Sequence, residues 1–171
     1  MKRALQSLTV AVVLRIVHAA IVELRELDSR VARELERLAD GSSYAVHASA
    51  SGPHLYVEWK DAELRRLPDL EPAGCAIDIK SMPLAFSLFT GQMGLAQGYA
   101  RHAFSVAGDV SDVMKLARLI SLVEAYLFPK LITRRILTDV PPTECSPLRV
   151  YARLATGFLT GRYKLYTQSP A

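Results

Sequence analysis

Residues 72–128 decide the fold, and they read PAGCAIDIKSMPLAFSLFTGQMGLAQGYARHAFSVAGDVSDVMKLARLISLVEAYLF. Two segments in this stretch, residues 75–80 and 102–109, alternate in hydrophobicity with the period of two that is typical of strands. Between them, residues 84–100 are rich in large apolar side chains and contain no Asp, Glu, Lys or Arg. An uncharged stretch of this length indicates either a buried core or the wall of an apolar pocket.

The same stretch carries the signals of helices. Ser81 is a good N-cap residue and Pro83 fits a first helical turn, so a short helix is expected there, followed by a loop and a second helical turn among the glycines. The turn at Gly108 and Asp109 leads into a longer helix that begins near Asp109 or Ser111 and ends before Pro129. Its apolar residues share one face: Val113, Leu116, Ile120, Val123 and Leu127.

The N-terminal part, residues 3–39, is expected to be helical, with a side-chain cap at Asp28 restarting a second helix and Gly41 ending it. Residues 8–22 are apolar nearly all round, so protein or lipid must cover them. Arg15 and His18 interrupt this run, which argues against a signal peptide and against a membrane span. The sequence therefore predicts a cytoplasmic protein, with peripheral attachment to a membrane left open.

The remaining segments predict a hairpin and a helical end. Residues 43–49 and 54–60 alternate on either side of a Ser-Gly-Pro turn and are expected to pair as antiparallel strands. Residues 62–67 fit a third strand or a connection equally well. A short helix over 130–137 and a last helix over 148–163 are expected towards the C-terminus.

Length and charge suggest one domain with a basic end. A chain of 171 residues, half of them hydrophobic, is long enough for one sizeable core. We divide it into an N-terminal helical segment (1–41), a core (43–128) and a basic extension (129–171). Residues 1–128 hold 14 basic and 15 acidic residues, whereas 129–171 hold 7 basic and 2 acidic ones. The extension thus suggests contact with something anionic, such as a bilayer, although solvated helix faces carry such arginines too. No nucleic-acid-binding motif is recognisable.

The order of segments from 43 to 128 resembles the sterol carrier protein type 2-like lipid-binding domains. The strand CAIDIK, the helix SMPLAFSLFTGQ, the strand AFSVAGDV and the helix SDVMKLARLISLVEAY carry this resemblance. It implies an α+β fold with about five strands in a mixed or antiparallel sheet, and helices that enclose an apolar tunnel for a fatty acyl, sterol-like or isoprenoid ligand. The long N-terminal helix and the C-terminal helical extension depart from the family pattern.

The resemblance also implies which residues meet the ligand. When the tunnel residues of the family are transferred by position to this sequence, they fall on Phe86, Phe89, Met93, Val113, Leu116 and Ile120. Tyr99 joins them at the mouth, with Arg101 and His102, as a group that orients a polar head. The physical basis is burial of a lipid tail against apolar side chains, with flexible methionine adapting to different tails.

These observations favour a non-enzymatic carrier that binds a lipid or other long apolar molecule and presents it to a membrane or to a partner enzyme. The alternative is a scaffold or accessory protein, for instance in quinone biosynthesis, that binds a partner, a membrane or a second copy through its apolar N-terminal helix and basic end. A third reading is an enzyme or metal site built from His47, His54 and Glu58. Such residues more often form the solvated face of a sheet, so no catalytic residue, metal or cofactor is expected. Cys75 and Cys145 have no metal-ligand spacing and are expected to be free thiols.

Overall fold

The computed structural model describes residues 2–68, 73–129, 132–133 and 142–163. It contains a five-stranded sheet in the order β3-β2-β1-β4-β5. The strands are β1 (Ser42–His47), β2 (His54–Lys60), β3 (Glu63–Leu67), β4 (Cys75–Ile79) and β5 (Phe104–Ala107). Strand β1 pairs antiparallel with β2 and parallel with β4, so the sheet is mixed. The α+β fold predicted from the sequence is confirmed, and residues 63–67 form a strand rather than a connection.

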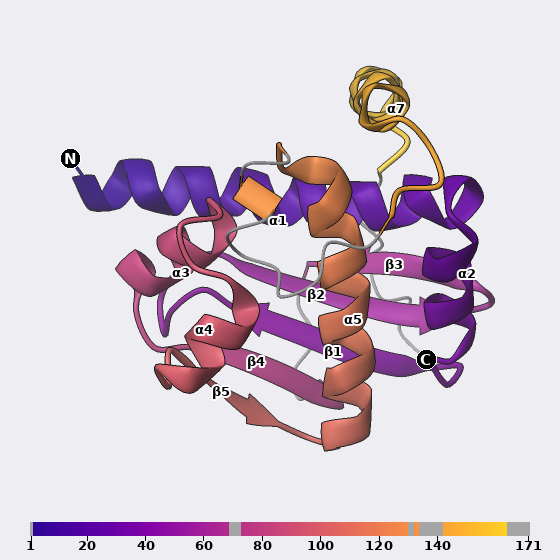
Figure 1. Ribbon diagram of the computed structural model, residues 1–171. Coiled ribbons are helices and arrows are strands. Elements are labelled where there is room, and N and C mark those ends of the chain that lie inside the picture. Colours follow the sequence, from indigo (N-terminus) through magenta and orange to yellow (C-terminus); the bar gives the residue numbers. More distant parts are fainter. Residues whose placement is uncertain (1, 69–72, 130–131, 134–141, 164–171) are drawn as a thin grey trace.

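Helices cover one face of this sheet (Figure 1). They are α1 (Lys2–Leu27), α2 (Ser29–Glu36), α3 (Met82–Phe89), α4 (Leu95–Ala100) and α5 (Val110–Leu127). A last helix, α7 (Pro147–Leu159), packs against α1 and lies farther from the sheet. The helix expected over 130–137 falls largely outside the described residues.

The helix boundaries follow the capping signals of the sequence. The Asp28 side chain accepts a hydrogen bond from the backbone N–H of Arg30 at 2.9 Å and separates α2 from α1. The Asp109 side chain accepts one from the N–H of Ser111 at 2.6 Å and starts α5. Gly108 precedes it with φ of +96°, and a Cβ there would stand 2.2 Å from the carbonyl oxygen of Gly74. Only glycine fits this turn.

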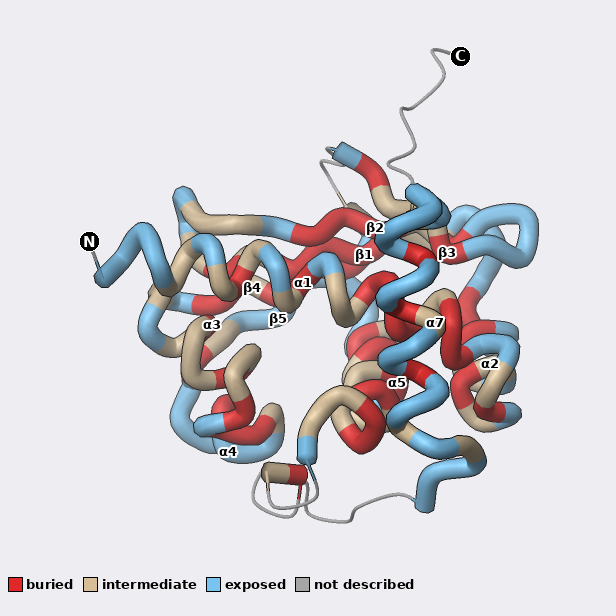
Figure 2. Tube along the Cα trace, turned by 90° about the horizontal axis from the view of Figure 1, so that it is seen from above, coloured by how far each residue is buried: buried red, intermediate tan, exposed pale blue. Residues whose placement is uncertain are grey.

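Helix α1 is the long arm of the helical layer. Its inner face is buried, whereas most residues of its first two turns are exposed (Figure 2). The His18 ring, 4% exposed, donates through Nε2 to the carbonyl oxygen of Leu64 in the edge strand β3 at 3.1 Å. By length and composition alone α1 meets the criteria for a membrane-spanning helix, yet a third of its most apolar window is buried inside the protein. This helix therefore contributes to the core, and its His18 hydrogen bond links the helical layer to the sheet.

Candidate ligand-binding cavity

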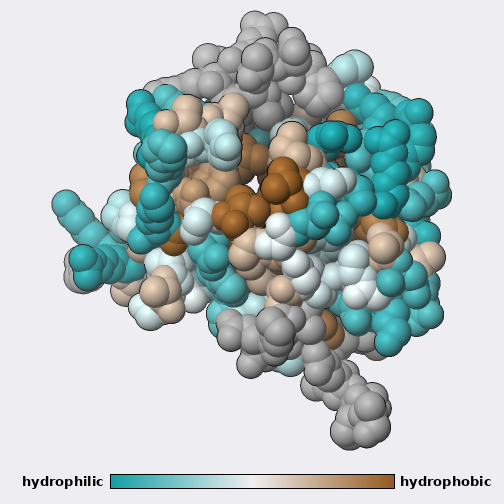
Figure 3. Space-filling view, turned by 90° about the horizontal axis from the view of Figure 1, so that it is seen from below, coloured by the Kyte–Doolittle hydropathy of each residue, from teal (hydrophilic) through white to brown (hydrophobic). Residues whose placement is uncertain are grey.

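An apolar cavity lies between the sheet and the helices. Its wall takes side chains from α1, α3, α4, α5 and all five strands. The wall residues are Val13, Leu14, Val17, Ile21, Leu38, Tyr44, Val46, Leu55, Val57, Leu64, Ile77, Ile79, Leu88, Phe89, Leu95, Phe104, Leu116, Leu119, Ile120, Val123, Glu124, Leu127 and Phe128. On the face seen from below, hydrophobic residues surround a hollow (Figure 3). The uncharged stretch of the sequence thus contributes both to a solid core and to a cavity wall.

The wall of the cavity extends along α5, although the cavity itself is small. The wall residues on α5 and at its C-cap run from Leu116 to Phe128, which is about 18 Å at the helical rise of 1.5 Å per residue. An extended chain advances about 1.2 Å per bond, so this length matches a tail of about 15 bonds. The volume of the cavity is about 80 Å³, which is enough for a few water molecules but not for a whole lipid tail. Entry of a tail therefore requires the surrounding side chains to move outwards.

Two polar side chains, Tyr44 and Glu124, interrupt the apolar wall. The Tyr44 hydroxyl and the Oε2 atom of Glu124 are both buried and without a hydrogen-bond partner. Burial raises the pKa of the Tyr44 hydroxyl, and the neighbouring Ser42 hydroxyl lowers it. Burial alone raises the pKa of Glu124 to about 7. Close to neutral pH this carboxyl is therefore partly protonated and able to donate as well as accept.

Three of the residues named from the sequence line this cavity, namely Phe89, Leu116 and Ile120. The other four lie outside its wall. Phe86 packs against the main core, Met93 and Val113 are buried in it, and Tyr99 is 72% exposed. Tyr99 still stacks at 6.3 Å on the ring of Phe104, which is a wall residue. Contact of any of these seven side chains with a ligand remains a prediction.

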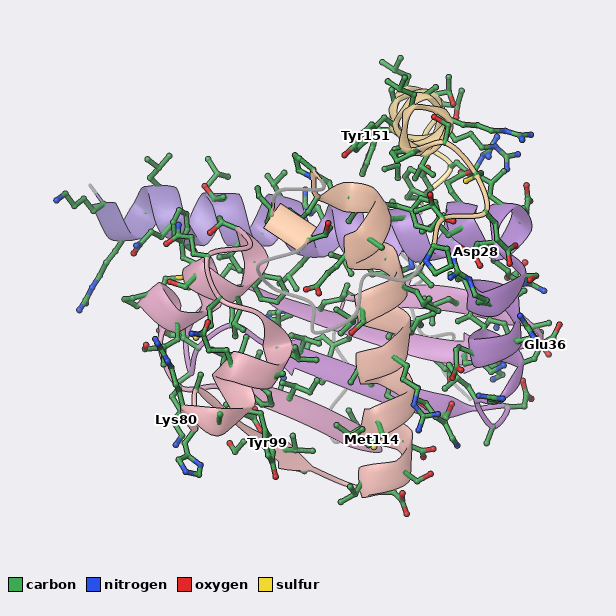
Figure 4. The ribbon with its side chains drawn as sticks, viewed as in Figure 1. Asp28, Glu36, Lys80, Tyr99, Met114 and Tyr151 are labelled. Carbon is green, nitrogen blue, oxygen red and sulfur yellow. The ribbon has the colours of Figure 1, made fainter. Side chains whose placement is uncertain are left out.

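The expected head-group residues lie on the surface. Arg101 and His102 are exposed in the turn before β5, where His102 adopts a positive φ of 51°. Figure 4 shows Tyr99 on α4 and Met114 on α5, both along the lower edge of the molecule. None of these residues belongs to the cavity wall, whose described polar side chains are Tyr44 and Glu124.

The histidines considered for catalysis do not form one site with Glu58. His47 and His54 are paired in register across the hairpin, whereas Glu58 is paired with Ser43. The Nδ1 atom of His47 lies 2.6 Å from a carboxylate oxygen of Asp78, and its Nε2 atom lies 3.2 Å from the Tyr56 hydroxyl. The His54 ring packs on the Tyr56 ring at 4.7 Å. Among the described residues, no group of three His, Cys, Asp or Glu side chains is arranged to hold a metal.

Part of the basic extension is engaged inside the protein. The buried carboxylate of Glu23 accepts from Arg162 at 2.9 Å and from the Tyr163 hydroxyl at 2.9 Å, and it lies 3.3 Å from Arg153. Arg153 also contacts Glu26 at 2.7 Å. These ion pairs attach α7 and the residues after it to α1. Of the three basic residues of the extension that the structure describes, Arg153 and Arg162 therefore have an acidic partner within the chain.

Sequence reasoning missed the contribution of α1 and of Glu124 to the wall. The signal for α1 was its apolar run over residues 8–22, which had to be covered by protein or lipid and was therefore a candidate for a buried wall. The signal for Glu124 was a single charged residue on the apolar stripe of α5, four residues after Ile120 and three before Leu127.

No family model and no curated protein matches this sequence. Several solved chains resemble it, among them two whose names are informative. One is titled "UbiJ-SCP2 Ubiquinone synthesis protein", with 19% identity and a TM-score of 0.45, and the match covers 63% of this chain and 96% of that one. The other is sterol carrier protein 2 like 2 from Aedes aegypti, with 11% identity, a TM-score of 0.36, and coverage of 56% and 94%. Both names carry the sterol carrier protein 2 label.

Proposed function

We propose that this protein binds a long apolar molecule in the cavity between α5, α1 and the sheet, and carries or presents that molecule without transforming it. The observation that carries this proposal is the composition of the wall: among the described residues, every side chain that lines it except Tyr44 and Glu124 is a hydrocarbon. Burial of a tail against such a wall contributes roughly 25 cal/mol per Å² of apolar area removed from water. The match between the length of the α5 wall and an extended tail supports the same conclusion.

The small volume of the cavity is compatible with this function if the side chains and helices of the wall can move outwards. Several wall residues belong to α3 and α4, two short helices with loops on either side, rather than to the sheet. A small outward movement of these helices widens the cavity without disturbing the strand pairing. We therefore expect ligand binding to raise the stability of the protein and to change the environment of α3 and α4.

The test is displacement of the uncharged dye Nile red by hexadecan-1-ol, followed by fluorescence and by native mass spectrometry. The substitution Ile120→Trp fills the cavity and should weaken binding at least tenfold. Met114→Trp adds the same ring to the exposed side of the same helix and should bind like the wild type. If the wild type takes up neither compound, or if both variants bind equally, the carrier function is wrong.

A second function, that of a scaffold, is favoured by one observation. The first half of α1 exposes Leu5, Leu8 and Val12, of which Leu5 and Leu8 are 67% and 64% exposed. Such a row on an extended helix suits another helix or a second copy of the chain. A scaffold predicts that Leu5→Glu combined with Leu8→Glu abolishes an oligomer in size-exclusion chromatography and leaves dye binding unaffected. If the wild type is already monomeric at high concentration, self-association is excluded.

A further inference from the structure

Glu124 places a carboxyl group in apolar surroundings, where it destabilises the protein unless a partner supplies its missing hydrogen bond. It sits on the stripe of α5 that faces the cavity, one turn from Ile120 on one side and from Leu127 on the other. Its Oε2 atom is buried and has no hydrogen-bond partner. Buried polar atoms in proteins nearly always have a partner, so an orphan oxygen in a cavity wall points to a ligand atom that supplies one.

The groups that face Glu124 across the cavity do not supply this partner. The wall residues from α1, α3 and α4 are all hydrocarbon side chains. The other polar residue of the described wall is Tyr44, whose hydroxyl is also buried without a hydrogen-bond partner. This hydroxyl lies in the neighbourhood of Asp112, Lys115 and Cys75, near the beginning of α5. Asp112 precedes Glu124 by twelve residues, or about 18 Å along the helix. The two polar groups of the wall are therefore well separated along α5.

We propose that Glu124 is the hydrogen-bonding group of the cavity, and that the cavity selects a long apolar molecule with one uncharged hydroxyl or carbonyl group at the end held by α5. This inference rests on the proposed function. A protonated carboxyl donates to a carbonyl and both donates to and accepts from a hydroxyl. An alkane leaves Oε2 without a partner, and a fatty acid places a second carboxyl against the first in apolar surroundings.

The proposal also fixes the orientation of the ligand. The head lies beside Glu124, and the tail runs along the helix past Ile120 towards Leu116. That distance is about 12 Å, which holds about 10 bonds of an extended tail, and the rest of a longer tail extends past Leu116. Tail length then affects contacts near Leu116 but not the hydrogen bond, whereas a change at Glu124 affects the head alone.

The experiment loads the protein from cyclodextrin containing equal amounts of hexadecan-1-ol and hexadecane, and measures the bound alcohol-to-alkane ratio by extraction and mass spectrometry. The variants are Glu124→Leu, which keeps the volume and removes the polar group, and Glu124→Gln, which keeps a donor and an acceptor. We expect the ratio to fall about tenfold in Glu124→Leu, as loss of one net hydrogen bond implies, and to stay within about threefold of the wild type in Glu124→Gln. Hexadecanoate should load poorly in the wild type.

The outcomes separate the two proposals. If the wild type loads both compounds and Glu124→Leu keeps the same ratio, the role of Glu124 is wrong while the carrier function stands. If the wild type loads neither compound, the carrier function fails and this inference fails with it. If Glu124→Leu does not fold, Glu124→Met offers the same comparison. An alcohol-to-alkane ratio in Glu124→Met equal to that of the wild type would likewise overturn the role of Glu124.

Discussion

Two carboxyl groups with buried oxygen atoms, those of Asp28 and Glu124, have opposite surroundings. Asp28, 1% exposed at the junction of α1 and α2, accepts hydrogen bonds from the Arg30 backbone N–H at 2.9 Å, from Arg30 Nε at 3.0 Å and from the Tyr126 hydroxyl at 2.5 Å. Glu124 precedes Tyr126 by two residues on α5, points into the apolar cavity and has an orphan oxygen. Figure 4 shows Asp28 at the end of the molecule where α1 meets α2.

The electrostatics of the two groups follow from these contacts. Burial raises the pKa of Asp28, but hydrogen bonds from Arg30 and Tyr126 outweigh burial and leave that pKa below its ordinary value. Burial acts alone on Glu124 and raises its pKa to about 7. A complete polar network fixes one end of the helical layer, whereas the carboxyl in the cavity wall is left with an incomplete one. The comparison teaches that α5 has one face fixed by polar contacts and another that lines the apolar cavity.

The largest effect should come from breaking the complete network. Asp28→Ala removes the cap of α2 and leaves the Arg30 guanidinium and the Tyr126 hydroxyl without their acceptor. We expect a loss of about 3 kcal/mol in the free energy of unfolding, because a buried ion pair loses one partner. Urea unfolding followed by circular dichroism measures it.

The matched control for Asp28 is Glu36→Ala, which removes an exposed carboxylate from α2 (Figure 4). It should change the free energy of unfolding by less than about 0.5 kcal/mol. Equal losses in the two variants would show that the Asp28 network adds nothing beyond a helical surface charge.

The next effect concerns Glu124 and depends on pH. Its pKa is raised in the folded protein from an ordinary 4.5 to about 7, so the folded state holds this proton more tightly than the unfolded state. The free energy of unfolding therefore falls as pH rises from about 4.5 to about 7, by on the order of 3 kcal/mol. Glu124→Gln lacks this titration, so it should become more stable than the wild type above pH 7 and equal to it near pH 4.

His18 acts on pH in the opposite direction and has to be separated from Glu124. Its burial lowers its pKa from 6.5 to about 4, so its contribution is lost as pH falls from about 6.5 towards 4. Because both proteins keep His18, this contribution cancels in the difference between the wild type and Glu124→Gln. A difference that does not change with pH between 4 and 8 would contradict the unpartnered burial of Glu124.

The fold could be predicted further than the site. Alternation in residues 54–60, the caps at Asp28 and Asp109 and the turn at Gly108 are local signals, and the structure confirms the elements that they indicate. Residues 63–67 stayed open because two arginines interrupt the apolar pattern; pairing with β2 decides that they form a strand.

The site depends on contacts between distant segments, which no local pattern contains. Position alone placed Phe89, Leu116 and Ile120 where the cavity is, but it also named Met93 and Val113, which are buried in the core outside the wall. Whether an apolar side chain on a helix faces a void or a neighbour depends on packing of α1 against α3 and α5, more than 50 residues away in sequence. The orphan oxygen of Glu124 is a property of the same packing.

The smallest effect should come from Glu144, at the edge of the hydrogen-bond network of Asp28, Arg30 and Tyr126. Glu144 lies in the segment before α7, and its carboxylate accepts from the backbone N–H and the hydroxyl of Ser29, both at 2.8 Å. Its own backbone N–H donates to the Tyr126 hydroxyl at 2.8 Å and does not need the side chain. Glu144→Ala therefore removes an anion from the beginning of α2 but keeps the backbone hydrogen bond to Tyr126. The Glu144 side chain is 41% exposed. We expect a loss of about 0.5–1 kcal/mol, decreasing with added salt, in the same urea unfolding experiment. A loss as large as that of Asp28→Ala would place Glu144 inside the network rather than at its edge, and the fixed face of α5 would then extend to the connection that leads into α7.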